Sequence, residues 1–220
     1  MPQQLSDKQL PYRLVIFDVD GTLVDSFQMM VDVVNEFAPK YKFKVLDQAS
    51  VAYLRELPPL QIRKALNLSA LKAFLLVLDC KTKVKKEKKA PSIFAGISET
   101  LTALKQEGIQ LAIVTSNSKE NCLLYLGQEL FDIFDWIECD ASIYGKARKI
   151  KKIVQRSKFS QQEILYIGDQ IVDIQSAHKN GIQSAAVTWG YNTESSLIQH
   201  QPHHLVQNIQ QLQYILFNLA

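Results

Sequence analysis

Two aspartates separated by one residue follow an apolar run near the start of the chain. Asp18 and Asp20 stand in the stretch LVIFDVDGTLVDS, directly after the four apolar residues 14–17. Side chains two residues apart in extended backbone point the same way, so both carboxylates can face one point. Gly21 then permits a tight turn. Such a pair is suited to binding a divalent cation, and a structural Asp-Gly turn is the alternative.

A hydroxyl and an amide follow a second apolar run. Ser116 and Asn117 come after residues 109–114 and before a predicted helix that starts near residue 119. Donors at a helix start can bind an anion, because the positive end of the helix dipole lies there. Taken alone, however, this pair is better explained as the N-cap of that helix.

Three further candidate residues stand at the starts of two predicted helices. Lys146 precedes a helix at 147–158, where a cation is unfavourable for the dipole, so an interior role is more plausible for it than for its neighbouring lysines. Asp169 and Asp173 lie four residues apart at the start of a helix at 171–180, so both carboxylates can face one side. A surface lysine and acids that merely stabilise a helix N-terminus are the simpler alternatives.

Helical and extended patterns alternate from residue 94 onward, which is typical of a parallel sheet with helices on its faces. The expected strands cover residues 14–17, 109–114, 136–139, 164–167, 184–188 and 204–206, and the expected helices 97–107, 147–158, 171–180 and 209–217. In open sheets of this class, ligands bind at the carboxyl ends of the strands. The sequence therefore predicts an α/β, Rossmann-like fold with its candidate residues at that edge.

The segment between the first two strands is too long for a simple crossover, which needs only about 30 residues. Helical patterns at 27–37, 48–57, 59–68 and 69–78 fill it, so we expect a small helical cap at residues 25–91 and an α/β core made of residues 1–24 and 92–220. The lysine-rich residues 81–89 are interpreted as a solvated linker with a possible part in steering substrate.

Composition narrows the range of functions. The 220 residues are 47% hydrophobic, enough for a full core, and a formal charge of +3 is too small to indicate nucleic-acid binding. Neither a membrane span nor a signal peptide is apparent, so we expect a cytoplasmic protein. We expect it to be a monomer or a homodimer. Cys80, Cys122 and Cys139 suggest neither a disulfide framework nor a zinc site.

Four stretches in order resemble the motifs of the haloacid dehalogenase-like hydrolases, a superfamily made mostly of Mg²⁺-dependent phosphatases. They are DVDGTLVD, VTSN, the lysine of YGKARKI, and GDQIVD. The resemblance covers residues 14–190 and is closest to the phosphoglycolate phosphatase group. One departure is Ala147, which stands where many relatives have a proline.

The resemblance implies a role for each polar candidate. Asp18 would attack phosphorus and form an aspartyl-phosphate, and Asp20 would serve as general acid and then general base. Ser116 and Asn117 would bind the phosphoryl group. Lys146 would bind it too and neutralise charge.

The resemblance also implies a magnesium site and a substrate class. Asp18, Asp169 and a backbone carbonyl at Asp20 would hold Mg²⁺. Asp173 would not bind the ion itself but would orient Lys146 or a metal-bound water. The cap would select a small phosphorylated metabolite, such as a phosphoglycolate-like phosphomonoester. A sugar phosphomutase with the same machinery and a non-catalytic binding scaffold are the alternatives. Asp20 favours phosphoryl transfer over dehalogenation, because the dehalogenase branch lacks that aspartate.

Overall fold

One parallel sheet forms the centre of the protein. The structure, a computed structural model, describes residues 10–87, 90–140 and 145–218. Within them, six strands pair in the order β3-β2-β1-β4-β5-β6, and every pairing is parallel. The strands are β1 (Leu14–Phe17), β2 (Gln110–Val114), β3 (Trp136–Glu138), β4 (Ile164–Gly168), β5 (Gln183–Val187) and β6 (His204–Val206). The predicted α/β fold is confirmed.

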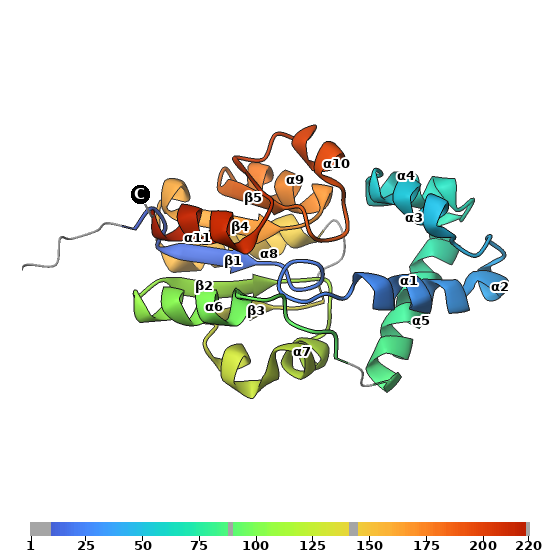
Figure 1. The fold of residues 1–220 in the computed structure, drawn as a ribbon, viewed down its shortest axis with the longest axis horizontal. Helices are drawn as coiled ribbons and strands as arrows, with labels where there is room; N and C mark the ends of the chain where they lie inside the picture. Colours follow the sequence, from blue (N-terminus) through green and yellow to red (C-terminus); the bar gives the residue numbers. More distant parts are fainter. Residues whose placement is uncertain (1–9, 88–89, 141–144, 219–220) are drawn as a thin grey trace, which may run out of the picture.

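Helices cover both faces of this sheet (Figure 1). They are α6 (Ile97–Gln106), α7 (Lys119–Asp132), α8 (Lys146–Ser157), α9 (Ile171–Lys179), α10 (Glu194–Ile198) and α11 (Ile209–Phe217), with a short 3₁₀ turn at Gln161–Glu163. In β1, Leu14 and Ile16 share a core cluster with residues of α8 and α9, while Val15 and Phe17 share one with residues of α6, α7 and α11. Burial on both faces explains why β1 is continuously apolar.

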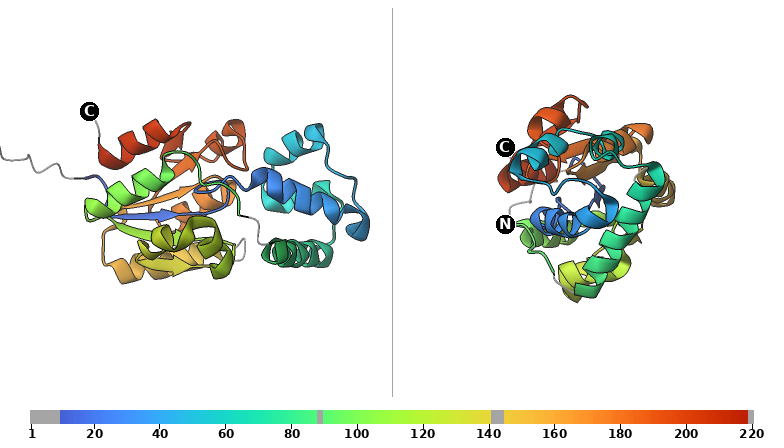
Figure 2. Two further views of the ribbon diagram at one scale, coloured as in Figure 1. Left: turned by 60° about the horizontal axis from the view of Figure 1, so that its bottom comes forward. Right: turned by 90° about the vertical axis from the view of Figure 1, so that its right-hand side faces the viewer.

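Five helices from the first crossover lie together beyond the carboxyl ends of the strands, as two views agree (Figures 1 and 2). These cap helices are α1 (Phe27–Glu36), α2 (Ala38–Tyr41), α3 (Gln48–Arg55), α4 (Pro59–Ala65) and α5 (Ala70–Glu87). Val24 and Ile93 pair in an antiparallel bridge, so the two chain passages to the cap lie side by side. The division at residues 25 and 91 stays a prediction.

The lysine-rich segment after residue 80 is helical, so its interpretation as a linker is wrong for residues 81–87. Helix α5 continues through it to Glu87, nine residues past the predicted end at 78. Leu76, Cys80 and Val84 recur every four residues and are buried, which gives this helix one continuous packed side. Residues 88 and 89 lie outside the described residues.

Candidate active site

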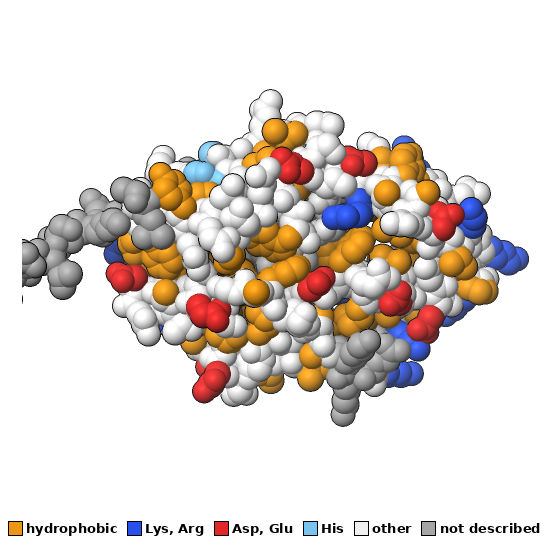
Figure 3. Space-filling model, viewed as in Figure 1, with side chains coloured by type: hydrophobic (Ala, Val, Ile, Leu, Met, Phe, Trp, Pro, Cys, Tyr) orange, Lys and Arg blue, Asp and Glu red, His pale blue; other side chains and the backbone are white. Residues whose placement is uncertain are grey.

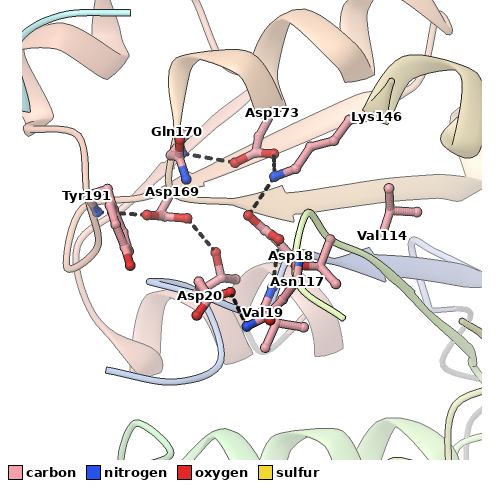
Figure 4. A network of polar contacts seen from close by, with 12 residues as sticks. Asp18, Val19, Asp20, Val114, Asn117, Lys146, Asp169, Gln170, Asp173 and Tyr191 are labelled. Atoms are coloured by element: carbon pink, nitrogen blue, oxygen red, sulfur yellow. Dashed lines mark hydrogen bonds and ion pairs between the residues drawn. The ribbon is translucent and has the colours of Figure 1, made fainter. Parts of the chain in front are cut away.

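A buried lysine lies between two aspartates from different elements. Lys146 Nζ is 2.6 Å from Asp18 Oδ2 and 2.7 Å from Asp173 Oδ1, and all three side chains are buried (Figure 4). Asp18 directly follows β1, Lys146 begins α8 and Asp173 lies in the first turn of α9. Residues 155 positions apart along the chain thus form one ion-paired group. Of the two roles that the resemblance implied for Asp173, the structure shows the contact with Lys146.

Asp169 completes a cluster of acids. It follows β4, and its Oδ1 accepts a hydrogen bond from Thr22 Oγ1 at 3.0 Å while its Oδ2 accepts one from the Tyr191 N–H at 2.7 Å. Carboxylate oxygens of Asp18, Asp169 and Asp173 lie within 4.8 Å of one another. The three acids therefore converge on one point at the carboxyl edge of the sheet.

The cluster places three carboxyl groups beside a single lysine. Burial raises the pKa of Asp169 well above its ordinary value, and the charges of Asp18 and Asp173 raise it further. Burial also raises the pKa of Asp173, although Lys146 opposes this effect. Burial alone would lower the pKa of Lys146, but Asp173 and Asp18 outweigh it and hold that pKa above its ordinary value. Such a cluster favours binding of an additional cation.

Asp20 lies beside this cluster in a separate contact. Asn117 Nδ2 donates to Asp20 Oδ2 at 2.9 Å, whereas the enclosed Asp20 Oδ1 has no hydrogen-bond partner among the described residues. Burial raises the pKa of Asp20 to about 6, and the charge of Asp18 adds to the rise. A carboxyl group with this pKa can hold and release a proton near neutral pH, which suits general acid and base catalysis. Its side chain lies outside the three-acid cluster.

The structure decides between the two interpretations of Ser116 and Asn117. The N-cap of α7 is Ser118, whose hydroxyl accepts from the Asn121 N–H, so neither candidate residue caps the helix. The Asn117 side chain instead holds Asp20, and its Oδ1 accepts from Asn121 Nδ2 at 2.8 Å. Ser116 is half-buried and makes no hydrogen bond within the described residues, which leaves its hydroxyl available to a ligand.

A loop after β5 positions Asp169, and the four motifs gave no indication of it. Besides the Tyr191 N–H bond, Asp169 packs against Gly190, where an added methyl group would lie 2.3 Å from the carboxylate. Arg55, at the end of α3, donates from Nη2 to the Gly190 carbonyl at 2.8 Å and from Nε to the Tyr191 carbonyl at 3.0 Å. The residue types of Gly190 and Tyr191 do not reveal this role, because it depends on their backbone groups.

Comparison with known proteins assigns the chain to a family. A family model described as haloacid dehalogenase-like hydrolase matches residues 15–187, most of the chain. The chain belongs to this family. The match extends from β1 to β5 and includes all four motifs, so the resemblance found in the sequence is confirmed.

Curated relatives within this family are named phosphatases. The phosphoglycolate phosphatase of Synechococcus elongatus is 29% identical over 194 residues, which cover 88% of this chain and 92% of that protein. The phosphoglycolate phosphatase of Pseudomonas fluorescens is 26% identical, over 96% of this chain and 81% of that protein. Together with the family assignment, these matches make the chain an enzyme of the phosphoric monoester hydrolase class.

Solved structures share the whole fold. A crystal structure described as a predicted phosphatase from Clostridium acetobutylicum superposes with a TM-score of 0.79 and covers 94% of this chain and 99% of that one. At 24% sequence identity, this similarity shows the fold alone. The cap and the core of this protein therefore have a counterpart of nearly the same length.

Proposed function

We propose that this hydrolase is a Mg²⁺-dependent phosphatase that removes phosphate from a small phosphorylated metabolite through an aspartyl-phosphate. The observation that carries the proposal is the buried ion pair between Lys146 Nζ and Asp18 Oδ2, at 2.6 Å, beside the Asp169 carboxylate. The curated phosphoglycolate phosphatases support a phosphoglycolate-like phosphomonoester as the substrate.

The residues at the edge of the sheet fit a magnesium ion. Mg²⁺ takes oxygen ligands and is commonly held by one or two carboxylates together with a substrate phosphate. Asp18 and Asp169, with the backbone carbonyl of Asp20, would hold it, and the crowding of carboxyl groups in the buried cluster favours its binding. When bound, the ion offsets negative charge on the phosphoryl group.

The nucleophile is Asp18, and its contacts fix the carboxylate before substrate arrives. Lys146 holds Oδ2, and the Val19 N–H donates to Oδ1 at 2.8 Å. A carboxylate oxygen of Asp18 attacks phosphorus as the bond to the leaving alcohol breaks, which gives the aspartyl-phosphate. Lys146 neutralises part of the charge that gathers there. The free Ser116 hydroxyl supplies a donor to the phosphoryl oxygens.

Asp20 transfers the protons. With Asn117 fixing one oxygen, Asp20 protonates the leaving alcohol in the first step and deprotonates the attacking water in the second. The pKa of about 6 is consistent with both directions of transfer.

The cap would select the substrate and exclude water during the reaction. Its helices lie over the carboxyl ends of the strands, and basic side chains gather toward the outer end of the cap on the face in Figure 3. Exposed cap lysines include Lys40, Lys42, Lys44, Lys64 and Lys72. Positive charge there would raise the local concentration of an anionic phosphate ester.

Two alternatives make different experimental predictions. A sugar phosphomutase would pass the phosphoryl group to a second substrate hydroxyl and release an isomerised sugar phosphate. A binding scaffold would release nothing, and it is disfavoured because Asp18, Asp20, Lys146 and Asp169 all occupy the site.

The decisive experiment is a phosphate-release screen of purified protein with Mg²⁺ against phosphorylated metabolites, phosphoglycolate included. We expect Asp18→Asn to bind substrate without turnover, whereas Asp25→Asn, which alters an exposed aspartate of the same stretch, keeps wild-type activity. Isomerised product without free phosphate would favour the mutase. Binding without any product would favour the scaffold, and an active Asp18→Asn variant would refute the aspartyl-phosphate.

The cellular location and the oligomeric state of this enzyme are also proposals. In the part of the chain that the structure describes, no helix is both long and apolar enough to cross a bilayer. We propose a cytoplasmic enzyme, monomeric or homodimeric, which fractionation and light scattering would test.

A further inference from the structure

Two cysteines from different elements lie in contact near the proposed active site. Cys122 Sγ, in α7, is 3.8 Å from Cys139 Sγ, which directly follows β3. Both are free thiols. The sulfur–sulfur distance in a disulfide is about 2.05 Å. The two sulfur atoms therefore have to approach by only about 2 Å to become bonded.

The two thiols differ in access and in charge environment. Cys122 is fully buried, whereas Cys139 is partly exposed. The contact with Cys122 lowers the pKa of Cys139, and the positive charges of Lys149 and Lys119 add to this effect. The thiolate is the reactive form of cysteine, so an oxidant in solution reacts first with Cys139. The buried partner is then in place to react with the oxidised sulfur.

Each cysteine is also adjacent in sequence to a residue that supports Asn117. Asn121, which precedes the buried cysteine, donates from Nδ2 to Asn117 Oδ1 at 2.8 Å. Asp140, which follows the partly exposed Cys139, donates its N–H to the Asn117 carbonyl at 2.8 Å. Asn117 in turn donates to Asp20. A bond that draws α7 and the end of β3 together would therefore act on both residues that hold Asn117.

We propose that Cys122 and Cys139 form a reversible disulfide when a peroxide oxidises the protein. The Cys139 thiolate attacks a peroxide oxygen, so an S–O bond forms as the O–O bond breaks, and the leaving hydroxide takes up the thiol proton as water. The Cys122 sulfur then attacks this sulfenic acid, the S–S bond forms as the S–O bond breaks, and the proton of Cys122 leaves in a second water. The two sulfurs lose two electrons and the peroxide gains them. A thiol reductant reverses the reaction.

The expected consequence is slower hydrolysis in the oxidised protein, and this part rests on the proposed function. Displacing Asn117 removes the contact that fixes Asp20, so we expect phosphate release to fall several-fold and to recover after reduction. The disulfide itself is detected by mass spectrometry, which does not depend on phosphate release. Failure of the proposed function would therefore leave the test of the disulfide intact.

The test treats the folded full-length protein with a small excess of hydrogen peroxide, blocks remaining thiols, and maps the peptides. We expect a loss of about two mass units and a cross-linked peptide pair containing Cys122 and Cys139, in wild type and in the control Cys80→Ser. Cys139→Ser and Cys122→Ala should lack the pair. In Cys122→Ala, dimedone should trap a sulfenic acid at Cys139, because the resolving thiol is absent.

Peptide mapping of the wild type needs no variant to fold, so it decides the proposal even if Cys122→Ala is unstable. Folded wild-type protein in which the two cysteines stay reduced, or are oxidised separately, would overturn the disulfide. A disulfide with an unchanged rate of phosphate release would overturn its effect through Asn117.

Discussion

Arg55 Nη2 lies 2.8 Å from the Gly190 carbonyl oxygen, and this contact joins the cap to the loop that holds Asp169. The next residue of that loop, Tyr191, donates its N–H to Asp169 Oδ2 at 2.7 Å. Asn192 strengthens the connection, since its Nδ2 donates back to the Arg55 carbonyl at 2.6 Å and its Oδ1 accepts from the Ile171 N–H. The position of the cap and the position of a proposed metal ligand are thus linked through three consecutive residues.

Replacing Arg55 by alanine should therefore weaken metal binding although Arg55 touches no metal ligand. We expect Mn²⁺ affinity, measured by electron paramagnetic resonance, to fall roughly tenfold, because losing hydrogen bonds from a charged donor costs about 1.5 kcal/mol. Arg63→Ala is the matched control, since among the described residues Arg63 donates only to the Leu68 carbonyl inside the cap. Unchanged Mn²⁺ affinity in Arg55→Ala would show that the loop holds Asp169 without the cap.

An alanine at position 190 should disrupt the proposed metal site by direct contact. Its methyl group would lie 2.3 Å from Asp169 Cβ and Oδ2 and 2.4 Å from the Gly21 carbonyl oxygen. We expect Gly190→Ala to lose most Mn²⁺ binding and phosphate release. Gly108→Ala is the control, because open space surrounds that glycine and only its positive φ makes alanine unfavourable, at about 1 kcal/mol. Wild-type metal binding in Gly190→Ala would contradict the tight packing.

Removing the buried positive charge of Lys146 should affect both the stability and the activity of the protein. In Lys146→Met the carboxylates of Asp18 and Asp173 lose their shared partner, which should cost about 3–5 kcal/mol of unfolding free energy. Phosphate release should fall by a factor on the order of 10³ or more, since charge at the phosphoryl group is no longer neutralised. Lys151→Met alters an exposed lysine of the same helix and should change neither quantity. Urea unfolding and initial rates test both effects.

The acids of the site should make the metal-free protein sensitive to pH. The folded-state pKa of Asp20, about 6, lies above its ordinary 3.8, so folding takes up a proton between these values. Its stabilising contribution is fully present below pH 3.8 and is lost as the pH rises through 6. In EDTA, Asp20→Asn should therefore stabilise the protein more at pH 7.5 than at pH 5, by about 1–3 kcal/mol.

Added Mg²⁺ should reduce that sensitivity, because it binds the folded state and offsets the charge of Asp169 and its neighbours. Urea unfolding of wild type and Asp20→Asn at the two pH values, with EDTA or Mg²⁺, makes the comparison. An equal effect of the substitution at pH 5 and 7.5 would show that Asp20 is not protonated near neutral pH in the folded protein.

Much of the fold could be predicted from the sequence because its signals are local. A strand buried on both faces must be continuously apolar, as β1 is, and polar residues at its carboxyl end must then lie at the ligand-binding edge. The helix at 81–87 was missed because lysines suggest solvent exposure. One side of this helix packs against the core through Val84. The hydrophobic periodicity of so short a segment did not reveal this contact.

The sequence by itself predicted which residues would do the proposed chemistry: the aspartates Asp18, Asp20 and Asp169, and a lysine at a helix start. Their types and order along the chain fixed the family, since few chemistries use that set. Only the tertiary structure decided how they are held. It placed Lys146 between Asp18 and Asp173, gave the N-cap of α7 to Ser118, and brought the Tyr191 N–H to Asp169. The physical reason is that backbone donors are the same at every residue, so only the path of the folded chain shows which of them reaches a carboxylate.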